Sequence, residues 1–212
     1  KGALDAEDFA VEDISDRVGQ SDTIVWVDLC GPTEAVLSQL AEELGLHDLA
    51  VEDALEPHQR PKLDRYASHL FLSCHAVRVD RERGELTSVE VDAFIGDTWL
   101  LTVRAEQDGT LDPVLDRWDR SSDIEVHGVS YLLYGLLDVV VDGYFEAVEV
   151  FEDYYDEVSS GIFADEPLAL SQQQHWFEMR RALVRFHRLV VPVREALSGL
   201  MRHEHGVVDE EM

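Results

Sequence analysis

Two adjacent carboxylates, Glu52 and Asp53, stand about one helical turn before the segment Pro57–Lys62, which reads PHQRPK. Carboxylate oxygens are suitable ligands for divalent metal ions. Neighbouring side chains on a helix diverge by about 100°, so these two cannot share one ion simply. They could serve two ions, or one ion through water, and the alternative is a solvated acidic turn. His58 is more typical of a hydrogen-bonding turn residue than of a metal ligand.

A third carboxylate, Asp138, interrupts the most apolar stretch of the chain, residues 129–141. An unpaired carboxylate buried in such a stretch would be costly. Either Asp138 reaches solvent on a narrow polar side of a helix with Asp142, one turn on, or it binds something positive.

Six further acidic residues follow within a short span of the same predicted helix: Glu146, Glu149, Glu152, Asp153, Asp156 and Glu157. Several of them lie four apart, a spacing at which like charges destabilise a helix. The next predicted helix offers four arginines: Arg180, Arg181, Arg185 and Arg188. Pairing between the two helices is the favoured interpretation, and weak cation binding is the alternative.

The helices around the first carboxylates follow from turn residues and apolar spacing. Residues 23–29 have the composition of a buried strand. Thr33 can cap a helix that Gly45 ends. A second short helix, about 48–55, carries the two carboxylates and ends before Pro57.

Three strands are predicted next, over residues 69–79, 86–95 and 98–103, and the short turns between them favour an antiparallel meander. A helix over 111–118 follows.

The first half of the chain mixes short strands and helices, whereas long helical repeats begin near Asp123. This change predicts two domains, residues 1–122 and 123–212. Apolar residues recur by four and three from Leu133 to Tyr155 and again from Met179 to Leu200. These repeats predict two long helices, the second bent locally by a proline.

The composition excludes several classes of protein. With 45 Asp and Glu against 17 Lys and Arg, the net charge of −28 repels nucleic acid and anionic lipid and concentrates cations. A halophile-like or solubilising surface is the alternative interpretation of this charge. The two cysteines lack a CxxC spacing and are predicted to be buried free thiols in a reducing compartment. No apolar run is long enough to span a membrane, so the chain is predicted to be a soluble fragment. No phosphate loop, nucleophile elbow or zinc spacing indicates an enzyme.

Three segments in order resemble the CorA-type magnesium transporters. They are GLHDLAVEDALEPHQRPKLDRY at 45–66, YLLYGLLDVVVDGYF at 131–145 and RLVVPVREALSGLMR at 188–202. The resemblance implies an α+β fold: an α/β/α sandwich with a mixed, largely antiparallel sheet, followed by two long antiparallel helices. It also implies a homopentamer on the cytoplasmic face of the cell inner membrane, held there by membrane helices beyond Met212.

The resemblance further implies regulatory Mg²⁺ sites between subunits, with Co²⁺, Ni²⁺ or Zn²⁺ as alternative ions. Asp53 matches a direct partner of one such site, and Glu52 and Asp138 match carboxylates of a second. Another ligand would come from beyond the chain's end. Bound ions would hold the closed state, and their loss at low Mg²⁺ would open the pore.

Two other functions stay open. A zinc transporter of the ZntB type has a similar soluble domain, although the lack of clustered His and Cys favours magnesium. An acidic helical interaction module without a metal role is the alternative from another class. A carboxylate-metal hydrolase lacks a recognisable nucleophile or base in this sequence.

Overall fold

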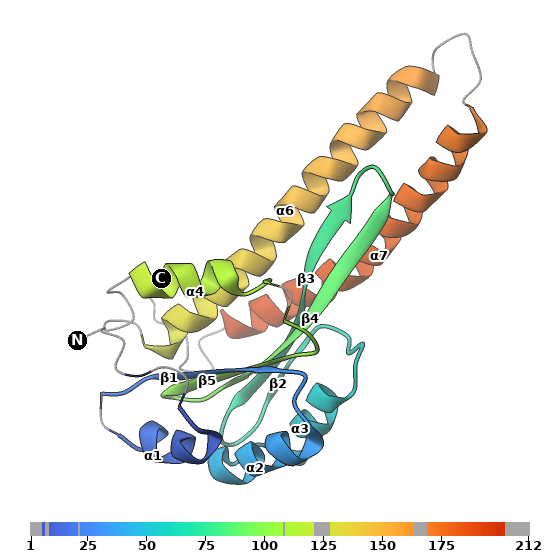
Figure 1. Ribbon diagram of the computed structural model, residues 1–212. Helices are drawn as coiled ribbons and strands as arrows, with labels where there is room; N and C mark the ends of the chain where they lie inside the picture. Colours follow the sequence, from blue (N-terminus) through green and yellow to red (C-terminus); the bar gives the residue numbers. More distant parts are fainter. Residues whose placement is uncertain are drawn as a thin grey trace.

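The computed structural model describes residues 6, 9–20, 22–107, 109–120, 128–162 and 169–201. A five-stranded sheet in the order β1-β5-β4-β3-β2 lies between two layers of helices (Figure 1). Its strands are β1 (Val25–Cys30), β2 (Lys62–Arg65), β3 (Leu70–Asp80), β4 (Glu85–Ile95) and β5 (Trp99–Arg104). β1 pairs with β5 in parallel, whereas β2, β3, β4 and β5 pair as antiparallel neighbours. The predicted α+β fold with a mixed, largely antiparallel sheet is confirmed.

The parallel pair of strands is closed by a buried ion pair. Arg104 at the end of β5 lies 2.7 Å from an Asp28 carboxylate oxygen on β1. Asp28 also accepts a hydrogen bond from Thr102 Oγ1 at 2.8 Å. Because both charges have several hydrogen-bond partners, the ion pair avoids the penalty of an unsatisfied buried charge.

One face of the sheet is covered by the N-terminal helices, which are η1 (Val11–Asp13), α1 (Ile14–Val18), α2 (Glu34–Leu44) and α3 (Asp48–Leu55). Thr33 accepts a hydrogen bond from Val36 N at the start of α2, and Gly45 ends this helix in the left-handed conformation at φ 65°. Both caps were predicted. The buried Leu37 and Leu40 of α2 share a core with Phe71 and Phe94 of the sheet.

The other face is covered by α4 (Asp112–Arg120), α6 (Val129–Ile162) and α7 (Leu170–Leu200). In Figure 1, α6 and α7 run in opposite directions along the long β3–β4 hairpin, which confirms the two predicted antiparallel helices. Gly143 lets α6 approach the sheet closely, because a Cβ there would lie 3.1 Å from Val77 O. Tyr144 Oη then donates a hydrogen bond to His75 O at 2.8 Å. The second layer of the sandwich is therefore built largely by residues 129–200.

Some features differ from the sequence predictions. The short helices η1 and α1 and the edge strand β2 were not predicted. Cys74 is a buried free thiol as predicted, but Cys30 is exposed, so that part of the prediction was wrong. Cys30 ends β1, where the chain leaves the core for a turn. The predicted division near Asp123 falls on residues 121–127, outside the described residues, and stays a prediction.

Candidate metal site

Glu90 on β4 fixes the segment that follows α3. Its two carboxylate oxygens accept hydrogen bonds from the backbone N–H groups of His58, at 2.6 Å, and Gln59, at 2.8 Å. His58 has φ 74°, a left-handed conformation that is uncommon for a residue with a Cβ. The clamp by Glu90 holds this strained turn and directs the chain back into β2.

Asp53 faces β2, where it meets a lysine. Lys62 Nζ lies 2.5 Å from an oxygen of Asp53 and 3.0 Å from an oxygen of Asp64. Partial burial alone would lower the pKa of Lys62, but the hydrogen bonds and charges of the two carboxylates raise it above its ordinary 10.5. The two carboxylates of Asp53 and Asp64 thus share the ammonium group of Lys62.

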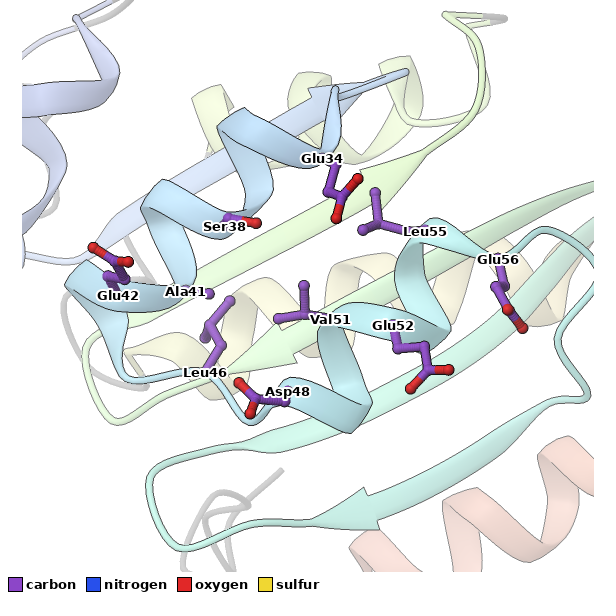
Figure 2. A pocket seen from close by; sticks show the side chains of 10 residues that line it. All are labelled: Glu34, Ser38, Ala41, Glu42, Leu46, Asp48, Val51, Glu52, Leu55 and Glu56. Carbon is purple, nitrogen blue, oxygen red and sulfur yellow. The ribbon is translucent and has the colours of Figure 1, made fainter.

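Glu52 precedes Asp53 on α3 and lines the same depression as Asp53 and Lys62. It is exposed on the ridge of α3 between two depressions of the surface. One lies between α3 and β2 and includes Asp53 and Lys62. The other lies between α2 and α3 and is drawn in Figure 2. Glu52 is therefore accessible from both sides.

Asp138 lies on α6, in the helical layer on the opposite face of the sheet from α3 (Figure 1). It is half-buried, and exposed aromatic residues on the same helix, Tyr134 and Phe145, flank it. The structure therefore brings Glu52 and Asp53 close together but leaves Asp138 far from both within one chain. In the described part of the chain, no three His, Cys, Asp or Glu side chains are grouped so that they could hold a metal ion.

A cluster of polar residues on β3 and β4, near the turn that Glu90 holds, was not predicted from the sequence. Ser73 and His75 on β3 lie opposite Asp92 and Glu90 on β4. Burial, together with the charges of Glu90 and Asp53, raises the pKa of Asp92 from 3.8 to about 7. Burial also lowers the pKa of His75 from 6.5 to about 4, with Arg185 and His58 acting in the same direction. The sequence did contain an indication of this cluster, because polar residues stand at alternate positions in two otherwise apolar strands.

The acidic cluster on α6 meets a cation from the sheet. Arg81, in the turn between β3 and β4, lies 2.6 Å from Glu157 and 3.7 Å from Asp153. The prediction named the arginines of the second long helix as partners. One of them, Arg185, donates instead to Leu86 O and Ser88 Oγ of β4. The β3–β4 hairpin therefore provides partners both for carboxylates of α6 and for Arg185 of α7.

Across the described ranges, no helix combines the length and apolar content needed to cross a membrane.

Solved structures share this three-layer arrangement. The soluble domain of CorA from Methanocaldococcus jannaschii matches with a TM-score of 0.72 at 18% identity, over 89% of this chain and 74% of that one. The ZntB cytoplasmic domain from Vibrio parahaemolyticus matches with a TM-score of 0.67 at 12% identity, over 86% and 71%. The fold therefore places the chain in the structural class that CorA and ZntB domains share.

Sequence comparison gives the family. A model described as CorA-like Mg2+ transporter protein matches residues 21–212, and the chain belongs to this family. The cobalt/magnesium transport protein CorA of Thermotoga maritima is 29% identical over 194 residues, which cover 90% of this chain and 54% of that protein. YfjQ of Bacillus subtilis, named as a metal ion transporter, is 30% identical over 191 residues, covering 90% and 58%. The chain thus spans somewhat more than half the length of these relatives.

Proposed function

We propose that the chain is the cytoplasmic regulatory domain of a CorA-like Mg²⁺ transporter and that it binds divalent cations at carboxylates shared between subunits. The observation that carries this proposal is the placement of the three candidate ligands. Glu52 and Asp53 lie on one outer layer of the sandwich, and Asp138 lies on the other. Two copies of the chain, with unlike layers facing, are needed to bring Asp138 of one copy beside Glu52 of the next, next to the site of Asp53.

The chemistry of the donors supports Mg²⁺. The proposed ligands are all carboxylate oxygens, and Mg²⁺ is commonly bound by one or two carboxylates while it keeps several waters. Zinc sites in proteins are richer in histidine and cysteine ligands. The similarity of fold to a ZntB domain supports a zinc transporter as a second candidate, but the oxygen-only ligand set favours magnesium.

Metal binding can act as a switch because the ions bind only the assembled state. With a net charge of −28 on each chain, neighbouring copies repel one another. Bound cations offset this repulsion and favour the assembled, closed form, whereas empty sites let subunits separate and the pore open. A homopentamer anchored in the inner membrane by helices outside this chain is part of the same proposal.

A magnesium titration tests this proposal. Sedimentation velocity and thermal unfolding of the chain are followed as Mg²⁺ is raised into the millimolar range. We expect the melting temperature and the oligomer size to rise with Mg²⁺ for the native chain. Asp53→Asn, Glu52→Gln and Asp138→Asn should each weaken the response, whereas Glu82→Gln, in the exposed β3–β4 turn, should not.

The full-length transporter provides the functional test. Asp53→Ala should keep the pore open at Mg²⁺ concentrations that close the native protein. A variant that still closes normally at millimolar Mg²⁺ would exclude the role assigned to Asp53.

A further inference from the structure

The surface between α2 and α3 is a groove with an apolar floor and acidic walls (Figure 2). It has a volume of about 700 Å³. Its floor is formed by Ala41, Leu46, Val51 and Leu55. The carboxylates around it are Glu34 and Glu42 from α2 and Asp48, Glu52 and Glu56 from α3 and its C-terminal cap. Because the two helices run in opposite directions in Figure 2, the acidic residues form two rows that border the floor along its length.

The charge of this groove is uncompensated. All five carboxylates are exposed, and within the described ranges none of them has an ion-pair partner. Asp48, Glu52 and Glu56 are spaced by four residues, and each such like-charge pair destabilises a helix by a few tenths of a kcal/mol. Glu56 also stands at the C-terminal end of α3, where a negative charge opposes the helix dipole. An isolated chain gains nothing from this arrangement, so the groove fits a positively charged occupant.

The same chain presents a surface with the opposite character on α7. Phe177, Arg181, Val184 and Arg188 follow one another at steps of four, three and four residues, which places them on one face of the helix. Phe177 is 56% exposed and Val184 is 42% exposed. Both arginines are exposed, and neither has an ion-pair partner in the part of the chain that the structure describes. We call these four residues the α7 stripe.

The α7 stripe faces away from the sheet. Met179, Phe186 and Val193 form the buried side of α7, and they lie on the opposite side of the helical wheel from the stripe. The α2–α3 groove belongs to the other helical layer, beyond the sheet. One chain therefore cannot place its own α7 stripe in its own groove.

The geometry points to a contact between copies of this chain, in which the α7 stripe of one copy docks in the α2–α3 groove of the next. The dimensions agree, since each acidic row spans about 12 Å and the two arginines of the stripe are separated by about 10 Å along the helix. Phe177 and Val184 cover the apolar floor, and the arginines reach the acidic rows. Such a contact joins unlike surfaces, so it builds a ring or an open chain of copies.

This contact deepens the self-association in the proposed function and rests on it, but it requires no metal ion. Its attraction is between opposite charges over an apolar centre, and it acts against the overall repulsion between chains that each carry a net charge of −28. Of the three proposed metal ligands, Asp53 and Asp138 take no part in it, whereas Glu52 lines the groove and belongs to both surfaces. Sedimentation velocity in EDTA therefore separates this contact from metal-driven assembly.

A charge-swap experiment tests the contact directly. The groove variant carries Glu42→Lys and Asp48→Lys, and the stripe variant carries Arg181→Glu and Arg188→Glu. In EDTA at physiological ionic strength, which screens the overall repulsion of chains with a net charge of −28, we expect the native chain to self-associate weakly. Each variant alone should associate at least about tenfold more weakly, which corresponds to about 1.4 kcal/mol. An equimolar mixture of the two variants should associate again, because each altered surface then has a complementary partner.

The control variant changes two charges outside both surfaces. Glu82→Lys with Arg83→Glu, in the exposed β3–β4 turn, should associate like the native chain, and circular dichroism verifies that every variant is folded. A native chain that stays monomeric in EDTA overturns the inference, as does association that charge reversal leaves unchanged or that the mixture fails to restore. Assembly that needs Mg²⁺, is lost in Asp53→Asn and ignores charge reversal supports the proposed function while overturning this contact.

Discussion

Lys62 Nζ lies 2.5 Å from Asp53 Oδ2, so the carboxylate proposed as a direct metal ligand already holds a cation of its own chain. The lysine comes from β2 and the aspartate from α3, and the turn clamped by Glu90 brings the two elements together. A divalent ion that binds Asp53 must therefore compete with Lys62. Lys62 therefore competes with the metal ion for Asp53 and raises the Mg²⁺ concentration that is needed to fill the site.

Replacement of this lysine should strengthen metal binding. In Lys62→Met, Asp53 and Asp64 lose their shared cation while the aliphatic volume is kept. Partly exposed ion pairs are worth roughly 0.2–1 kcal/mol, so we expect the Mg²⁺ affinity to rise by up to about fivefold. Calorimetric titration measures this affinity, and Arg60→Met, an exposed residue in the turn that precedes β2, is the matched control. A lower affinity in Lys62→Met would show that the lysine assists metal binding.

Removal of the Glu90 clamp should loosen the turn after α3. In Glu90→Ala, the backbone N–H groups of His58 and Gln59 lose both acceptors, and the left-handed turn at His58 loses its support. We expect a loss of about 2 kcal/mol in the free energy of unfolding, measured by urea denaturation. Hydrogen exchange of the His58 and Gln59 amides should accelerate as well. Protection equal to that of the native chain would contradict the clamp.

Asp92 should make stability fall with pH over a defined range. Its pKa is about 7 in the folded chain and 3.8 ordinarily, so between these values the folded chain keeps a proton that the unfolded chain releases. Folding stability from this group is complete below pH 3.8 and is lost as pH rises to about 7. His75, with a folded pKa of about 4 against 6.5, acts in the opposite direction over the range from 4 to 6.5.

The two effects offset each other in the native chain, and Asp92→Asn removes only one of them. The stability of the native chain minus that of Asp92→Asn should therefore decrease by a few kcal/mol between pH 4 and pH 7. Urea unfolding at a series of pH values measures this difference. A difference that is constant with pH would show that Asp92 titrates normally.

Gly135 on α6 should resist enlargement. A Cβ there would lie 2.7 Å from Nε1 of the buried Trp118, whose ring packs edge-on against Trp26 with centroids 4.4 Å apart. Overpacking costs roughly 1–3 kcal/mol, whereas alanine in a helix gains about 1 kcal/mol over glycine, so Gly135→Ala should lose about 1 kcal/mol.

Tryptophan fluorescence should report this change, because the added Cβ displaces the indole of Trp118, which packs against Trp26. Gly199→Ala on α7 is the control, since its Cβ would meet only the flexible end of Leu63 at 3.1 Å. That variant should be neutral or slightly more stable than the native chain. A higher unfolding midpoint in Gly135→Ala would refute the crowding at Trp118.

The sequence predicted the elements whose signals are local. α3 was expected over about 48–55 and is observed over Asp48–Leu55, because a proline ends it within the same segment. Gly45 ends α2 for a similar local reason. The three strands of the meander were predicted to within a few residues, because apolar runs and tight turns mark them.

The missed features depend on contacts between distant segments. The short strand β2 reads KLDR, which carries no strand pattern of its own and exists because it pairs with β3. The partners of Asp53 and of the α6 carboxylates, Lys62 and Arg81, are defined by how the chain turns back, which no local spacing shows. The candidate ligands Glu52, Asp53 and Asp138 were found from the sequence, but their separation on two outer layers required the fold.

The parallel pairing of β1 with β5 also governs when the domain can form during synthesis. Trp26 Nε1 donates to Thr102 Oγ1, 76 residues later in the chain. β1 must therefore remain unpaired until the whole meander has left the ribosome, which takes several seconds at about 5–20 residues per second. During that interval, its apolar residues are exposed to chaperones and to other nascent chains. The acidic residues of the turn and helix that follow β1 would then help to keep the unpaired strand soluble.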